Sequence, residues 1–139
     1  MLNKAQVVAE YNHFLESTKL KPEQAALNCG ALAVLLGARE ETEDLDIDVD
    51  PAFFDTIAES ASPGNSTLDG LFGQLIQYSP LVSIHKASGI PTEMYGSVCG
   101  YTLEALIDQK VKMMHHPKRK PGKSEADAKD VGSLKKLLD

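Results

Sequence analysis

The sequence predicts an α/β (α+β) fold, a small mixed β-sheet with flanking helices, and three observations support this prediction. The 139 residues are 42% hydrophobic, which is enough material for one core and not for two. Apolar residues recur with helical spacing near both ends of the chain, whereas residues 44–50 alternate with the period of a strand. No internal repeat or long linker divides the chain, so we expect a single domain over residues 1–139.

The first half of the chain is expected to alternate helices and strands. In order, these are a helix over 3–18, a buried strand over 25–30, a short helix over 30–37, a strand over 44–50 and a short helix over 52–59. Asn3 is suited to cap the first helix, Gly37 stops the second, and Pro51 ends the strand.

The second half is expected to hold short strands followed by two helices. In order, these are a turn-rich loop over 60–66, strands over 75–79, 81–86 and 97–100, a helix from 102 to about 114, a polar loop over 115–123 and a last helix ending near 138. Thr102 can cap the first of these helices, and Ser124 with Asp127 forms an S-x-x-D capping box for the last.

The composition excludes several classes of protein. No run reaches the roughly 18 apolar residues of a membrane span, and the first residues lack the apolar run of a secretory signal. Two cysteines are too few for a disulfide framework. A net charge of −6 argues against nonspecific DNA coating. We therefore expect a cytoplasmic protein with reduced thiols and no membrane partner.

The charge is unevenly distributed along the chain. Residues 39–50 contain seven acids and one base, whereas residues 110–123 contain six bases and no acid. Such a split suggests an acidic patch that holds a cation and a basic patch that faces an anion; two solvated surface runs are the alternative.

The strand over 44–50 is the most informative segment. Residues two apart on a strand share a face, so Asp44, Asp46, Asp48 and Asp50 stand in a row while the residues between them point into the core. Carboxylates roughly 7 Å apart repel one another, and a divalent cation reverses that cost. A calcium loop would need Gly where Val49 stands. A charged edge strand and charge for solubility remain as alternatives.

Residues 28–49, N-C-G-A-L-A-V-L-L-G-A-R-E-E-T-E-D-L-D-I-D-V, resemble the motif of the nucleotidyltransferase (polymerase-beta-like) superfamily, in which a glycine turn precedes a D-x-D strand. The similarity is to small stand-alone members, including those of toxin–antitoxin and abortive-infection systems and related phage proteins. It covers residues 28–50 well and 101–138 loosely, where Gln109-Lys110 and Lys129-Asp130 resemble the family's Q-K and K-D pairs.

The resemblance implies a nucleotidyltransferase-like fold with a nucleotide site and a metal site. The implied nucleotide-binding residues are Gly30 at the phosphate turn, Ala31 in place of a second Gly or Ser, Arg39, Thr42 and Lys110. Asp44 and Asp46 match the catalytic pair, and Asp44, Asp46 and Asp48 would hold Mg²⁺ or Mn²⁺. From the residues alone, Lys110 shares a helical stripe with Leu103, Ile107 and Met114, and a solvent-directed ammonium on a packed stem is the alternative.

A third carboxylate, which the superfamily usually places on a neighbouring strand, is not evident. The candidate strand over 81–85 offers Ser83 or His85, and Glu93, in an expected loop, and Asp69 are the substitutes. The four histidines lack zinc-ligand spacing, and Cys29 and Cys99 show no sign of nucleophilic chemistry.

Two functions follow as hypotheses. The first is a Mg²⁺-dependent transferase that moves a nucleotidyl group from a nucleoside triphosphate to an RNA or protein acceptor. The second is a catalytically lapsed nucleotidyltransferase fold that binds a protein partner as an antitoxin, decoy or inhibitor.

Overall fold

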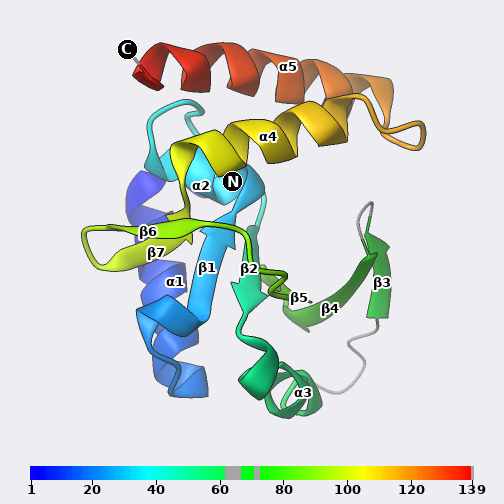
Figure 1. Cartoon of the computed structure of the whole chain (residues 1–139). Helices are drawn as coiled ribbons and strands as arrows, with labels where there is room; N and C mark the ends of the chain where they lie inside the picture. The colour runs from blue at the N-terminus through cyan, green and yellow to red at the C-terminus, as the bar shows by residue number, and fades with distance from the viewer. Residues whose placement is uncertain (62–66, 71–72, 139) are drawn as a thin grey trace.

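The computed structural model describes residues 1–61, 67–70 and 73–138, and it contains one mixed sheet flanked by helices (Figure 1). The helices are α1 (Lys4–Thr18), η1 (Pro22–Gln24), α2 (Cys29–Leu35), α3 (Pro51–Glu59), α4 (Leu103–Met114), α5 (Pro121–Lys135) and η2 (Lys136–Leu138). The strands are β1 (Ala25–Asn28), β2 (Leu45–Val49), β3 (Thr67–Gly70), β4 (Gly73–Ser79), β5 (Val82–Lys86), β6 (Thr92–Tyr95) and β7 (Val98–Tyr101). The predicted α+β class is confirmed.

The sheet has the strand order β3-β4-β5-β2-β1-β7-β6. β2 runs antiparallel to β1 and parallel to β5, and β1 runs parallel to β7, so the sheet is mixed as predicted. The central strands are the buried ones, because α1 supplies Val7, Tyr11 and Phe14 to a core that they share with β1 and β2. None of the described helices is long and apolar enough to cross a bilayer.

The predicted alternation in β2 is confirmed. Leu45, Ile47 and Val49 are fully buried, and Asp46 between them is partly exposed on the opposite face. Asp50 does not continue the row, because the strand ends at Val49. Its carboxylate instead accepts the backbone N–H of Ala52 and caps α3, which is the common use of an aspartate before a helix.

Two of the predicted helix caps are confirmed and one is wrong. Asn3 forms a capping box at the start of α1, and Thr102 accepts the N–H of Ala105 in α4. The last helix already begins at Pro121, so Ser124 and Asp127 lie inside it and make no capping box. Asp127 is fully buried and needs a cationic partner there rather than a backbone N–H.

The stripe predicted on α4 is rotated relative to the observed one. The buried residues of this helix are Leu106, Lys110 and Met113, whereas Leu103, Ile107 and Met114 are only half-buried. Lys110 is 1% exposed, so its ammonium group does not reach solvent along a packed stem. The reason is that α5 packs over α4 and supplies carboxylates to this lysine.

β3 and β6 were not predicted. Glu93 lies in β6, not in a loop, and pairs with Gly100 of β7. Of the loop expected over 60–66, residues 62–66 lie outside the described part of the chain. Figure 1 shows α4 and α5 together at one end of the sheet, next to α2. The two C-terminal helices therefore lie close to the end of β1 and the start of β2, which come from the first half of the chain.

Candidate functional site

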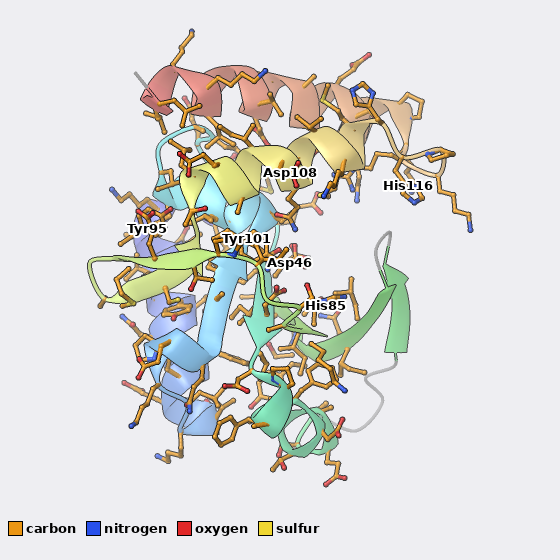
Figure 2. All side chains as sticks on the ribbon, viewed as in Figure 1. Asp46, His85, Tyr95, Tyr101, Asp108 and His116 are labelled. Atoms are coloured by element: carbon orange, nitrogen blue, oxygen red, sulfur yellow. The ribbon has the colours of Figure 1, made fainter. Side chains whose placement is uncertain are left out.

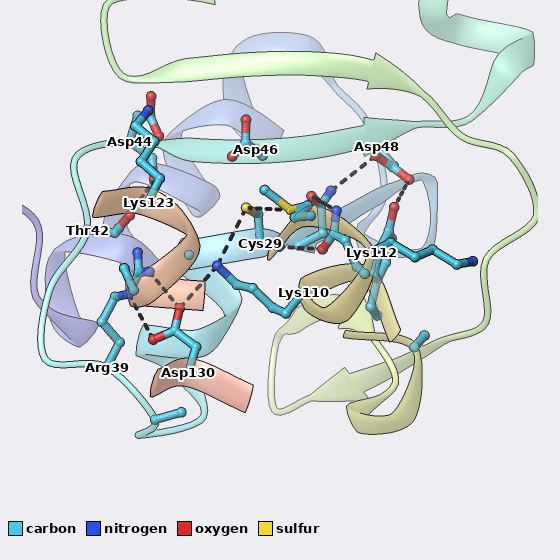
Figure 3. A pocket seen from close by; sticks show the side chains of 18 of the residues that line it. Cys29, Arg39, Thr42, Asp44, Asp46, Asp48, Lys110, Lys112, Lys123 and Asp130 are labelled. Carbon is cyan, nitrogen blue, oxygen red and sulfur yellow. Dashed lines mark hydrogen bonds and ion pairs between the residues drawn. The ribbon is translucent and has the colours of Figure 1, made fainter. Parts of the chain in front are cut away.

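A cleft of about 1630 Å³ opens between the polar face of the β2–β5 region and the α4–α5 pair. Seven of the eight residues named as site residues from the sequence line it: Gly30, Arg39, Thr42, Asp44, Asp46, Asp48 and Lys110. The eighth, Ala31, is buried inside α2 and does not line the cleft. Figure 3 shows the three aspartates along one segment and Lys110 across from them.

The carboxylates of Asp44 and Asp46 form the acidic wall of the cleft. Burial raises the pKa of Asp46 to about 6, and the neighbouring carboxylate of Asp44 adds to the shift, while Lys110 opposes it. The pKa of Asp44 is also raised, first by burial and then by Glu43, whereas Lys123 lowers it. The ionised forms of these two carboxylates are therefore disfavoured, and a bound cation would stabilise them.

Asp48 differs from Asp44 and Asp46, because both of its carboxylate oxygens already accept hydrogen bonds. Oδ1 accepts from Nδ2 of Asn28 at 3.1 Å and Oδ2 accepts from the hydroxyl of Tyr101 at 2.5 Å. Nδ1 of His85 lies 3.9 Å from Oδ1. Burial raises the pKa of Asp48, and the bonds from Tyr101 and Asn28 and the charge of His85 offset part of that rise. Whether Asp48 also binds metal stays a prediction.

A hydrogen-bonded chain continues from Asp48 to the start of α2. Asn28 accepts from Nε2 of Gln109 at 3.1 Å, and Oε1 of Gln109 accepts the backbone N–H of Cys29 at 3.0 Å. Cys29 has a positive φ of 54°, a conformation that is costly for a residue with a side chain. Gln109 thus holds the sharp turn between β1 and α2 in place.

The opposite wall of the cleft is cationic. Arg39 makes a bidentate pair with Asp130, with Nε 3.2 Å from Oδ1 and Nη2 2.6 Å from Oδ2. Nζ of Lys110 lies 3.1 Å from both Asp130 and Asp127, and Arg119 makes a second bidentate pair with Asp127. Burial disfavours the charged form of Lys110, but its pKa is nonetheless raised, first by Cys29 and then by Asp130 and Asp127.

The strand predicted to carry a third carboxylate is the parallel neighbour of β2, as expected. Asp46 is paired with Ser83 and Asp48 with His85 across this β2–β5 ladder. Glu93 is exposed on β6, at the far edge of the sheet from β5, and does not line the cleft. The side chain of Asp69 lies outside the described part of the chain. Among the described residues, no group of three His, Cys, Asp or Glu could hold a metal ion.

Several residues of the cleft, or of the ion pairs behind it, were not recognised as site residues from the sequence. Asp127, Asp130 and Leu134 share one buried face of α5, at a spacing of three and four residues that marks a helical stripe. Two acids within an apolar stripe are a signal of buried ion pairs, and this signal could have been recognised. Tyr101 and Asn28 carry no such signal, since their partners are distant in sequence. Figure 2 shows Tyr101, Asp46 and His85 one after another from the end of the sheet next to α4 towards β5.

No protein-family model matches the chain, and neither a curated protein nor a solved structure matches it. The resemblance to nucleotidyltransferases therefore stays a prediction. The cleft combines a carboxylate wall, a cationic wall and, beside them, Gly30 at the start of α2.

Proposed function

We propose that the chain binds a nucleoside triphosphate with Mg²⁺ or Mn²⁺ in this cleft and transfers its nucleotidyl group to an RNA or protein acceptor. The supporting observation is that two walls of opposite charge line a single cleft, with Asp44 and Asp46 on one and Arg39 and Lys110 on the other. A metal–triphosphate complex presents a cation and an anion side by side, so it complements both walls at once.

The acidic wall fits a metal that is completed by its substrate. Mg²⁺ commonly uses one or two carboxylates together with phosphate oxygens and water, and it rarely sits in a cage made only of protein groups. Asp44 and Asp46 supply two carboxylates whose burial raises their pKa, so a cation between them would stabilise their charged forms. When bound, the metal would neutralise charge that develops on the transferred phosphoryl group.

The cationic wall fits the phosphates. Arg39 presents a planar guanidinium that can donate two hydrogen bonds to phosphate oxygens, and Lys123 lies near Asp44 at the same side of the cleft. Thr42 is a buried hydroxyl beside Arg39. These groups would orient the triphosphate against the metal, which is the main contribution of a protein to phosphoryl transfer.

The test is calorimetric titration of the protein with each of ATP, CTP, GTP and UTP, with and without Mg²⁺. We expect saturable binding that requires the metal and is lost in Asp46→Asn. Asp55→Asn is the matched control, because Asp55 is an exposed aspartate on α3 and does not line the cleft. Transfer of label from the bound nucleotide to an RNA pool or to candidate proteins then tests the reaction. Absence of nucleotide binding in the wild type would contradict the proposal.

The second candidate is a protein-binding module on a lapsed nucleotidyltransferase fold. The observation that favours it is the pairing of Asp46 with Ser83, since a neutral hydroxyl is a poor general base for activating an acceptor. On this hypothesis, Asp46→Asn would leave binding to a purified partner and its stoichiometry unchanged. Loss of the biological effect in a folded Asp46→Asn protein would contradict it.

A further inference from the structure

Gly30 lies beneath two side chains of the cleft. It is buried, and a methyl group at this position would place its carbon 2.6 Å from Nη1 of Arg39 and 2.9 Å from Oγ1 of Thr42. Contacts this short do not occur in folded proteins, so a side chain here would force the guanidinium away. The absence of a side chain at position 30 therefore makes room for Arg39.

The backbone of the same turn is poorly available to a ligand. The N–H of Cys29 already donates to Gln109, and the helix that follows is only seven residues long. A phosphate approaching Gly30 from the cleft would meet the guanidinium of Arg39 before the backbone. Side chains, and not the turn itself, are then the donors that an anion encounters.

Arg39 is a cation that a ligand could reach, as are the exposed Lys112, Lys123 and Lys129 that also line the cleft. Its side chain is 27% exposed, whereas that of Lys110 is 1% exposed and already lies 3.1 Å from two carboxylates. Asp130 takes Nε and Nη2 of Arg39, and Nη1 donates to no described residue. The guanidinium therefore has a fixed plane, and the two N–H groups of Nη1 are left to donate to a ligand.

Charge in this cluster is not balanced. Arg39, Lys110 and Arg119 contribute three positive charges, and Asp127 and Asp130 contribute two negative ones. Within these ion pairs one positive charge is in excess, and the nearest further anion is Asp46 on the opposite wall, whose pKa the charge of Lys110 lowers. A metal ion bound at Asp46 would leave that positive charge to an anionic ligand.

We infer that Arg39 is a phosphate-binding side chain of the cleft with a fixed orientation, that Gly30 acts by admitting it, and that Asp130 is a positioning residue that orients it. This inference rests on the proposed function and identifies how the same site recognises the phosphates. It differs from the sequence-based prediction for Gly30, in which the backbone of the turn meets the phosphates directly.

A double-mutant cycle tests the part played by Gly30. Affinities for Mg·ATP and for inorganic tripolyphosphate are measured by calorimetry in the wild type, Gly30→Ala, Arg39→Ala and the double variant. We expect each single change to weaken binding roughly 10- to 100-fold, the worth of a charge-assisted hydrogen bond, and the double variant to be no weaker than Arg39→Ala. An equal further loss from Gly30→Ala in the Arg39→Ala background would show that Gly30 acts on binding by a route other than Arg39, and it would overturn the inference.

A second series of variants tests Asp130, and the direction in which the affinity changes separates the two possible roles of this residue. Asp130→Asn removes a negative charge next to the phosphates, so affinity should rise if this aspartate merely competes for the cations. If Asp130 positions Arg39, affinity should instead fall, Asp130→Glu should restore part of it, and the effect should vanish in the Arg39→Ala background. Asp127→Asn is the matched control, because it makes the same charge change on α5 without an ion pair to Arg39. Thermal unfolding verifies that each variant is folded, and this series decides alone if Gly30→Ala does not fold.

The outcomes separate this inference from the proposed function. Wild-type binding that Arg39→Ala leaves unchanged, or tighter binding by Asp130→Asn, overturns the inference and leaves the proposed function standing. If the wild type binds neither Mg·ATP nor tripolyphosphate, the proposed function fails and the inference fails with it.

Discussion

Asp46 of β2 stands directly beside Ser83 of β5 in the parallel ladder that joins these two strands. Ser83 is buried, and its hydroxyl lies 3.5 Å from Oε1 of Gln77, so the side chain at this position is polar but carries no charge of its own. A carboxylate at this position would face the acidic wall of the cleft. The position therefore controls how strongly the cleft attracts a divalent cation.

We expect Ser83→Asp to tighten binding of Mg²⁺ by about tenfold or more, because one further carboxylate near the ion adds more than 1.4 kcal/mol of attraction. Without metal, the same substitution should lower the melting temperature through repulsion of Asp46. Thermal unfolding across a range of Mg²⁺ concentrations measures both effects. Ser83→Asn, similar in size and uncharged, is the control; an equal response of both variants to Mg²⁺ would contradict the prediction.

The raised pKa of Asp46 makes stability depend on pH. Its pKa of about 6 in the folded state exceeds the ordinary value of 3.8, so the folded state holds this proton more tightly than the unfolded state does. The associated stability is present below about pH 4 and is lost as the pH rises through 6. Asp46→Asn should therefore increase the free energy of unfolding at pH 8 by about 2–3 kcal/mol, and change it little at pH 4.

Urea unfolding of both proteins at pH 4 and pH 8 tests this difference. Asp55→Asn, on the exposed surface of α3, is the control for the loss of a carboxylate outside the cleft. Saturating Mg²⁺ should remove the advantage of Asp46→Asn at pH 8, since a bound cation stabilises the wild-type carboxylate. An advantage of equal size at both pH values would mean that Asp46 is not desolvated.

The parts of the fold that were predictable from the sequence are those with a local signal. The alternation of β2 and the caps at Asn3 and Thr102 follow from interactions between residues close in the chain. The open question at Lys110 could not be settled locally, because its partners, Asp127 and Asp130, come from another helix. The packing of α5 against α4 determines which residues of α4 are buried. The spacing of apolar residues within α4 alone does not predict this packing.

The candidate site shows the same division. Asp44 and Asp46 stand out because carboxylates at strand spacing repel unless a cation is near. The different state of Asp48 was not predictable, because Asn28 and Tyr101 reach it from β1 and β7 through the packing of the sheet.

Lys110 and Lys112 lie on the same helix, but we expect their replacement to affect stability very differently. Lys110 is buried between two aspartates, whereas Lys112 pairs with Asp108 at 2.9 Å on the surface, where both side chains are more than half exposed. Lys110→Met should lower the free energy of unfolding by about 3–5 kcal/mol, because each of two buried carboxylates then loses one of its two cationic partners. Lys112→Met should change it by less than about 0.5 kcal/mol. Chemical denaturation of both variants tests the difference, and losses of similar size would contradict the burial of Lys110.

Tyr101 supplies the shortest hydrogen bond to Asp48, and its removal should destabilise the charged carboxylate most. Tyr101→Phe should lower the free energy of unfolding by about 1–3 kcal/mol near pH 8, because a buried acceptor loses its donor. The loss should shrink at acidic pH, where protonation of Asp48, whose pKa burial already raises, removes the charge that needs the donor. Tyr95→Phe is the matched control, since its hydroxyl donates to the uncharged backbone carbonyl of Tyr101 and its effect should not depend on pH over this range. A Tyr101→Phe loss that stays constant from pH 8 to pH 4 would mean that the hydroxyl does not stabilise the charge of Asp48.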